Sequence, residues 1–166
     1  MNINELSDIF EVRKLDEYDV ENIYNLCKEN REYYKYCPPY VTKDNILRDM
    51  TALPDGCYME NKYYIGYFNE EGLVAVLDLI SGYPEYDTFY IGFFMMKFSM
   101  QGKNIGSYII EELCNYLKNV GIKAVELAWI TGNEKAKNFW IKNKFIIMEQ
   151  CRYINGMDII KAKRNL

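Results

Sequence analysis

The stretch Gln101-Gly102-Lys103-Asn104-Ile105-Gly106-Ser107 decides the fold of this chain, because it separates a strand-like segment from a helix-like one. Residues 89–96 are mostly aromatic, β-branched or thioether residues and predict a β-strand. After the turn, apolar residues recur at helical spacing and predict an amphipathic helix: Ile109, Ile110, Leu113, Leu117 and Val120. A glycine-bearing turn that opens a helix leaves backbone N–H groups unpaired at the positive end of the helix dipole. The stretch therefore predicts a phosphate-binding site.

The composition is that of an ordinary globular protein, and we expect one domain over residues 1–166. The net charge of −4 gives no sign of a nucleic-acid partner. No apolar span is long enough to predict a membrane segment, and the N-terminus lacks a secretory signal. The cysteines are scattered, without a Cys-x-x-Cys pair: Cys27, Cys37, Cys57, Cys114 and Cys151. We therefore expect reduced thiols in a cytoplasmic protein.

The chain contains no histidine, and this absence excludes several classes of enzyme. A Ser-His-Asp triad, a Cys-His pair and a histidine-liganded zinc site all require that side chain, so we expect no metal. Acid–base chemistry would fall to carboxylates, tyrosine, lysine, water or the N-terminus.

The pattern of apolar residues predicts an α+β domain with a mixed, mostly antiparallel sheet and about four helices. Strands are expected at residues 10–15, 63–68, 73–80, 89–96, 124–130, 145–153 and 157–162. Helices are expected after Asp16, after Thr42, after the glycine turn as far as Gly121, and over residues 133–143. Residues 30–40 are aromatic and irregular, and Asn155-Gly156 predicts a hairpin.

Two common phosphate loops do not fit the glycine turn. A dinucleotide-binding Gly-x-Gly-x-x-Gly requires a βαβ unit, whereas the strand here follows two others in an antiparallel meander. A Walker A loop ends in Gly-Lys-Ser/Thr, but Gly106 is followed by Ser107-Tyr108.

The turn resembles instead the acyl-CoA loop of the GNAT superfamily of N-acyltransferases, whose usual form is Gln/Arg-Gly-x-Gly-x-Gly/Ala. Asn104 stands at the middle glycine, and asparagine is the residue that best tolerates left-handed backbone angles after glycine. A second match lies in residues 133–145, which look like the family's Asn-x-x-Ala-x-x-x-Tyr-x-x-x-Gly-Phe signature. The order of predicted elements also matches, so the resemblance covers nearly the whole chain.

The resemblance implies an enzyme that moves an acetyl group from acetyl-CoA, or another acyl-CoA, to a primary amine of a small molecule or peptide by direct attack. It implies that the cofactor contacts the strand before the turn, the turn itself and the second signature. These residues are Phe94, Met95, Met96, Gln101, Gly102, Lys103, Asn104, Ile105, Gly106, Ser107, Asn133, Lys137 and Trp140. Each has an alternative: core packing for the strand residues and Trp140, a helix N-cap for Asn133, and solvation for the two lysines.

The acid and base of such a reaction stay open. Many relatives donate a proton from a tyrosine where this chain has Trp140, so solvent or another tyrosine such as Tyr153 is the candidate acid. Asp78 interrupts an apolar strand and is the candidate base, with a partnered buried carboxylate as the alternative. Glu126 and a relay of water molecules are further candidates.

The acceptor site of the resembled fold lies over the first two helices and their connection. Here that connection carries Tyr33, Tyr34 and Tyr36, with Glu29 and Glu32 nearby, which suits a small or polyamine-like cation. Ordinary packing of these tyrosines is the alternative. A homodimer is left open, and so are two non-enzymatic roles: a sensor that binds acyl-CoA without turnover, and an interaction domain.

Overall fold

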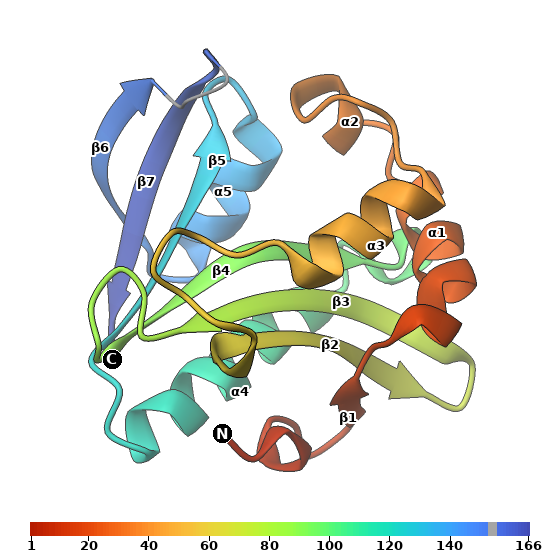
Figure 1. The fold of residues 1–166 in the computed structure, drawn as a ribbon, viewed down its shortest axis with the longest axis horizontal. Helices are drawn as coiled ribbons and strands as arrows, with labels where there is room; N and C mark the ends of the chain where they lie inside the picture. Colours follow the sequence, from red (N-terminus) through yellow and green to blue (C-terminus); the bar gives the residue numbers. More distant parts are fainter. Residues whose placement is uncertain (153–155) are drawn as a thin grey trace.

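The computed structural model describes residues 1–152 and 156–166, and its centre is a seven-stranded sheet in the order β1-β2-β3-β4-β5-β7-β6 (Figure 1). The strands are β1 (Glu11–Lys14), β2 (Lys62–Asn69), β3 (Gly72–Ser81), β4 (Thr88–Met96), β5 (Ala124–Ile130), β6 (Ile146–Arg152) and β7 (Asp158–Asn165). Strands β2, β3 and β4 form the predicted antiparallel meander, and β4 and β5 are the parallel neighbours. The predicted mixed, mostly antiparallel sheet is therefore confirmed.

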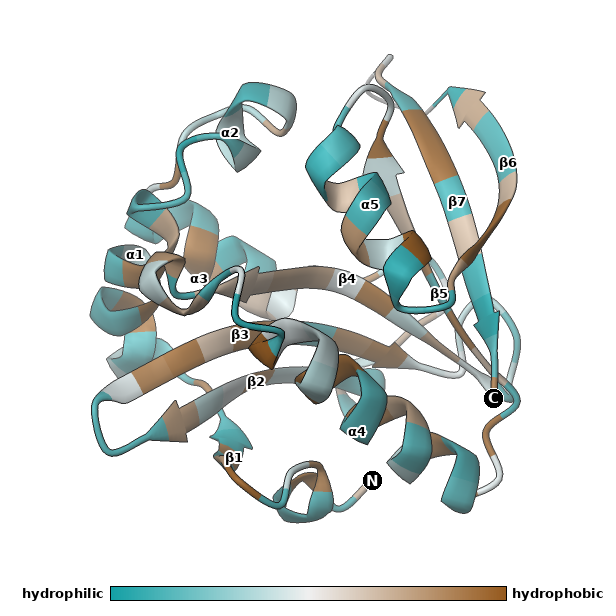
Figure 2. Ribbon diagram, turned by 180° about the vertical axis from the view of Figure 1, so that it is seen from behind, coloured by the Kyte–Doolittle hydropathy of each residue, from teal (hydrophilic) through white to brown (hydrophobic). Residues whose placement is uncertain are grey.

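Helices cover both faces of the sheet (Figures 1 and 2). Helices α1 (Val20–Lys28) and α3 (Lys43–Thr51) lie on one face, joined by the short α2 (Tyr33–Tyr36). Helices α4 (Ile105–Asn119) and α5 (Glu134–Lys142) lie on the other. Because both faces are covered, β3 is hydrophobic along most of its length (Figure 2).

The two faces have separate hydrophobic cores. On the α4 side, Leu77 and Leu79 of β3 pack with residues such as Ile110 and Leu113. On the α1 side, Val76 of β3 packs with apolar residues of α1 and α3. From Ala75 to Leu79, alternate residues of β3 thus enter alternate cores, as the strand period of two requires.

Helix caps agree with the sequence in most places. The Thr42 side chain accepts from the backbone N–H of Asn45, and α4 ends before Gly121, which has a φ of 91°. Two expectations were wrong in detail. Asp16 caps a 3-10 turn, Glu17–Asp19, that precedes α1 rather than α1 itself, and the irregular segment contains the single helical turn α2. Asn155, on which the predicted hairpin between β6 and β7 depends, lies outside the described residues.

Strands β4 and β5 separate beyond the middle of the sheet. Their pairing runs from Thr88 with Ala124 to Ile91 with Leu127 and then stops. The register between β3 and β4 shifts at the same point, because Leu79 is opposite Ile91 while Asp78 is opposite Phe93. Gly92 is therefore a β-bulge, and beyond it β4 and β5 diverge (Figure 1).

No helix within residues 1–152 and 156–166 is long and apolar enough to span a bilayer. All five cysteines are free thiols, as the sequence predicted.

Candidate active site

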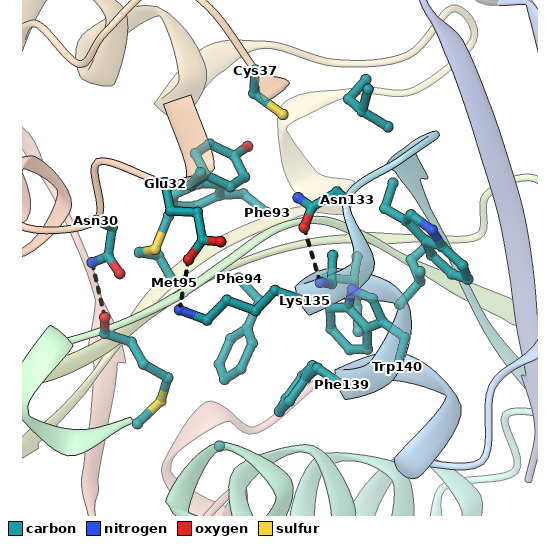
Figure 3. Close-up of a pocket in the computed structure, with 18 of the residues that line it drawn as sticks. Asn30, Glu32, Cys37, Phe93, Phe94, Met95, Asn133, Lys135, Phe139 and Trp140 are labelled. Atoms are coloured by element: carbon teal, nitrogen blue, oxygen red, sulfur yellow. Dashed lines mark hydrogen bonds and ion pairs between the residues drawn. The ribbon is translucent and has the colours of Figure 1, made fainter. Parts of the chain in front are cut away.

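The divergence of β4 and β5 opens a cleft of about 1020 Å³ (Figure 3). Its lining includes β4 from Tyr90 to Met96, the glycine turn, the start of α5 and the connection after α1. Most of the residues predicted to hold a cofactor come together here: Phe94, Met95, Met96, Gln101, Gly102, Asn104, Gly106, Ser107, Asn133 and Trp140. Among the described residues, β5 offers β4 no backbone partner from Gly92 to Met96, so the polar groups on this edge of β4 can pair with an extended ligand.

The glycine turn has the backbone geometry of an anion site. Gly102 has a φ of 75°, and Asn104, the N-cap of α4, has a φ of 63° and a ψ of 1°. The prediction that asparagine keeps the left-handed conformation of the usual glycine is confirmed. The first turn of α4, a helix described over its whole length, carries no acidic residue, so its positive dipole end is not neutralised from within.

Gly106 allows the two helices on this face to pack closely. A Cβ atom added there would lie 3.2 Å from the Phe139 ring and 3.6 Å from the Met96 side chain. The turn is therefore held against α5 as well as against the end of β4.

Three of the predicted cofactor residues lie outside the cleft lining. Ile105 packs against the core, Lys103 is exposed, and Lys137 pairs with Glu134 one turn away at 3.2 Å. A different lysine, Lys142, contacts the glycine turn, where Lys103 or Lys137 was expected. Lys142 lines the cleft and donates from Nζ to Oδ1 of Asn104 at 2.7 Å. Lys142 carried no special signal in the sequence, since a lysine on a helix usually faces solvent.

A polar group at the end of β4 also escaped the sequence analysis. The buried Asn30 donates from Nδ2 to the carbonyl oxygens of Leu26 (3.0 Å) and Met96 (3.1 Å). Gln101 donates from Nε2 to Oδ1 of Asn30 at 2.6 Å and to the same Met96 carbonyl at 3.2 Å. These two amides take the place of the missing strand partner of β4 and fix the turn to α1.

An ion pair crosses the mouth of the cleft. Nζ of Lys135, in the first turn of α5, lies 3.0 Å from Oε1 of Gln101 and 3.6 Å from Oε2 of Glu32 (Figure 3). Both members of the pair are more than half exposed, so water weakens their attraction. Glu32 was predicted to attract an acceptor cation, but it faces Lys135 instead.

The inner wall of the cleft is aromatic. Trp140 is buried, and the centroid of its ring lies 4.9 Å from that of Phe139, 5.2 Å from that of Phe145 and 6.1 Å from that of Phe94. Trp140 was predicted either to contact the cofactor or to pack in the core; it belongs to the core and also lines the cleft. This apolar wall suits the acyl end of a ligand.

Two buried polar side chains point to ligand contacts. Asn133 caps α5 by accepting from the N–H of Ala136 at 3.0 Å and also lines the cleft, so both of its predicted roles are compatible. Trp129 on β5 lines the cleft, and its indole N–H finds no acceptor among the residues that the structure describes. A buried donor of this kind is available to a carbonyl group of a ligand.

Asp78 does not line the cleft. It is buried on the α1 side of β3, where both carboxylate oxygens approach Nζ of Lys62, Oδ1 at 2.9 Å and Oδ2 at 3.0 Å. Burial raises the pKa of Asp78, whereas the charge of Lys62 lowers it. Its carboxylate lies beneath Gly92, since a Cβ atom there would be 2.8 Å from Oδ2. The structure thus favours the partnered carboxylate that the sequence left as an alternative.

The other acid–base candidates are placed as follows. Glu126 is bound to Lys163 at 3.0 Å and does not line the cleft. Tyr153 lies outside the described residues, so its role as the acid stays a prediction.

The predicted acceptor tyrosines separate into two groups. Tyr33 lines the cleft and also a second cavity of about 490 Å³, which Tyr34 lines as well. Tyr36 lines neither, because α2 is a single turn whose side chains point in different directions. Burial raises the pKa of Tyr33 well above its usual range, so this hydroxyl is neutral.

Comparisons with known proteins agree with this geometry. The model of the Acetyltransferase (GNAT) family matches residues 18–145, so the chain belongs to the GNAT acetyltransferase family. No curated protein matches the chain in sequence. The family is one of enzymes that take the acetyl group from acetyl-CoA, and the predicted cofactor and reaction class are confirmed at that level.

Several solved structures share the fold. An acetyltransferase from Thermus thermophilus is 18% identical, with a TM-score of 0.77 over 95% of this chain and 97% of that chain. The PaiA N-acetyltransferase from Thermoplasma acidophilum, solved with coenzyme A, is 19% identical, with a TM-score of 0.64 over 93% and 99%. A chimera of the spermidine N-acetyltransferase SpeG from Vibrio cholerae and hSSAT is 18% identical, with a TM-score of 0.69 over 94% and 95%.

Proposed function

We propose that this protein is an N-acetyltransferase that moves the acetyl group of acetyl-CoA directly to a primary amine of a small molecule or peptide. We take residues 1–166 as one catalytic unit. The five free thiols suit a reducing compartment, for which we propose the cytoplasm.

One observation carries the proposal. The cleft beside the unpaired part of β4 and the second cavity share three lining residues, Tyr33, Cys37 and Phe93. The glycine turn lies at the far end of the cleft, and the aromatic second cavity lies on the other side of the shared residues. A donor and an acceptor entering from opposite ends would meet at Phe93, where β4 has left β5.

The residues of the cleft suit the cofactor by chemical type. The N–H groups at the start of α4, together with Lys142, would hold the pyrophosphate. The edge of β4 at Phe94, Met95 and Met96 that faces away from β3 would pair with the pantetheine arm, apart from the Met96 carbonyl that Asn30 and Gln101 already bind. Asn133 would contact the arm near the sulfur. When bound, the cofactor supplies an activated acetyl group.

The reaction needs an unprotonated amine. Its nitrogen forms a bond to the acetyl carbon, the carbon–sulfur bond breaks with its electron pair on sulfur, and a proton passes from nitrogen to sulfur. A backbone N–H of β4 would stabilise the negative charge on the carbonyl oxygen. We propose water as the carrier of the proton from the amine and Tyr153 as donor to sulfur, with Asp78 remaining the structural partner of Lys62.

The test is a measurement of coenzyme A release and of acetylated product by mass spectrometry, with acetyl-CoA and a panel of amines. The panel contains monoamines, diamines, polyamines, amino acids and short peptides, and a reaction without amine corrects for hydrolysis. We expect acetylated product from at least one class. Binding of coenzyme A in calorimetry without product from any amine would contradict the proposal and favour a sensor.

A further inference from the structure

The second cavity places a carboxylate among aromatic rings. It lies on the α1 side of the sheet, between the connection after α1, helix α3 and the start of the free part of β4. Its rings come from Tyr33, Tyr34, Tyr64 and Phe93, and its polar lining from α3 includes Arg48 and Asp49. Its volume of about 490 Å³ suits a small organic molecule.

Among the residues that the structure describes, Asp49 is the only acidic one in that lining. Its side chain is accessible, and none of the described residues donates a hydrogen bond to it or forms an ion pair with it. The two cations whose charges act on Asp49, Lys62 and Arg48, are engaged elsewhere. Lys62 donates from Nζ to Asp78 and, at 2.7 Å, to the carbonyl oxygen of Ala52. Arg48 binds the side chain of Asn45 and the carbonyl oxygen of Asp44.

The pKa of Asp49 reflects this position. Burial among the cavity walls raises the pKa of its carboxyl, and the charges of Lys62 and Arg48 lower it only in part. An incoming cation would pair with a carboxylate that the cavity walls desolvate only in part. Neutral tyrosine rings around the carboxylate add the attraction of their faces for a cation.

The cavity leads toward the acetyl-transfer point. Tyr33 and Phe93 form the boundary with the cofactor cleft, and their ring centroids are 5.8 Å apart at an interplanar angle of 76°. An elongated molecule bound at Asp49 could extend past this pair, so that its far end enters the cleft. Asp49 would then recognise a group other than the one that reacts.

We propose that this cavity is the acceptor subsite for an aliphatic diamine or polyamine, with the ammonium group remote from the reacting nitrogen bound by Asp49. The proposal rests on the N-acetyltransferase function proposed above. It adds a selecting residue on α3, whereas the sequence pointed to Glu29 and Glu32, which lie at the cleft.

The experiment compares α,ω-diamines with n-alkylamines of equal length in the wild type, in Asp49→Asn and in Asp49→Glu. A charge-assisted hydrogen bond is worth roughly 10- to 100-fold in affinity, so we expect the wild type to prefer diamines by about that factor in kcat/KM. Asp49→Asn should remove this preference by raising KM for diamines, with kcat and KM for acetyl-CoA little changed. Asp49→Glu should restore part of it.

Asp44→Asn is the matched control. It removes the same charge from the same helix, but Asp44 does not line the cavity, so the preference for diamines should persist. A wild type that prefers monoamines or amino acids would overturn the proposal. So would an Asp49→Asn variant that keeps the preference for diamines.

Calorimetry separates this proposal from the broader one. Diamine binding to the protein saturated with coenzyme A does not require turnover. If no amine is acetylated but a diamine binds wild type and not Asp49→Asn, the acetyltransferase proposal fails and the subsite stands. If an amine is acetylated while diamine affinity is the same in both proteins, only the subsite fails.

Discussion

The two halves of the active site are built from different kinds of atom. The cofactor half, made by the glycine turn, α4, α5 and the free part of β4, presents mainly backbone groups at positions set by Gly102, Asn104 and Gly106. The acceptor half, made by α1, α2 and α3 over β2 and β3, presents side chains. A backbone site can hold any ligand with the right phosphates, whereas a side-chain site can be changed residue by residue.

The halves also differ in what stabilises them. Aromatic rings around Trp140 and close helix packing at Gly106 hold the cofactor half together. Buried or half-buried ion pairs, Arg13 with Asp19 and Lys62 with Asp78, hold the acceptor half. Charged groups of the acceptor half are thus structural in these pairs and, at Asp49, available to a ligand.

The largest expected effect comes from Lys62→Met. Its side chain is 1% exposed, and its Nζ joins Asp78 on β3 to the carbonyl of Ala52 just after α3. The variant leaves a buried carboxylate without its partner, which costs about 3–5 kcal/mol. We expect a fall in Tm of about 10 °C in a thermal melt followed by circular dichroism.

The double variant Lys62→Met/Asp78→Leu distinguishes charge from packing. Replacing both members of a buried pair by apolar residues is often neutral, so the double variant should recover most of the decrease in Tm seen in Lys62→Met. Lys43→Met, which breaks an exposed pair with Glu21 in the same half, should leave Tm unchanged. A double variant as unstable as the single one would show that the pair is not what stabilises this half.

The difference between the halves explains what the sequence could predict. The glycine turn, its strand and its helix are neighbours in sequence, so periodicity and turn chemistry predicted these three elements, whereas the individual cofactor contacts were predicted from the family resemblance. Asn104 was correctly expected to adopt left-handed angles, because that property belongs to one residue and its turn.

The acceptor half depends on contacts between distant segments. Asp49 is a polar residue on a helix, a pattern that usually means a solvent-facing surface. Asp78 was noticed because it interrupts an apolar strand, but its partner Lys62 begins a different strand, where a lysine is ordinary. Only the sheet register brings the two together, and a single sequence does not contain it.

An intermediate effect is expected where the chain enters α1. Arg13 binds the nearly buried Asp19 with two hydrogen bonds of 2.8 and 2.7 Å, which lowers the pKa of that carboxyl. Asp19→Asn removes the charge but keeps an oxygen for the N–H of Asp16. We expect a loss of about 1–2 kcal/mol in the free energy of unfolding at pH 7, reduced by the partial exposure of Arg13.

The sign of the pH dependence follows from the lowered pKa. The stabilisation is complete above the unfolded pKa of about 4 and is lost as the pH falls through the lower folded value. In urea unfolding, the difference in the free energy of unfolding between wild type and Asp19→Asn should therefore stay constant between roughly pH 5 and 7. It should fall to zero below about pH 3. A gap that widens on acidification would refute this account.

The smallest effect tests whether the cofactor half depends on backbone shape. Asn104→Val places a β-branched residue at a φ of 63°, which costs about 1–2 kcal/mol, so we expect KM for acetyl-CoA to rise about 10-fold. Asn104→Gly removes the same contact with Lys142 but adopts that φ freely, and its KM should stay near that of the wild type. Steady-state kinetics and calorimetry with coenzyme A measure both. An equal rise in KM for acetyl-CoA in the two variants would mean that the Lys142 contact, and not the backbone shape, holds the cofactor. Both halves of the site would then bind their ligands through side chains.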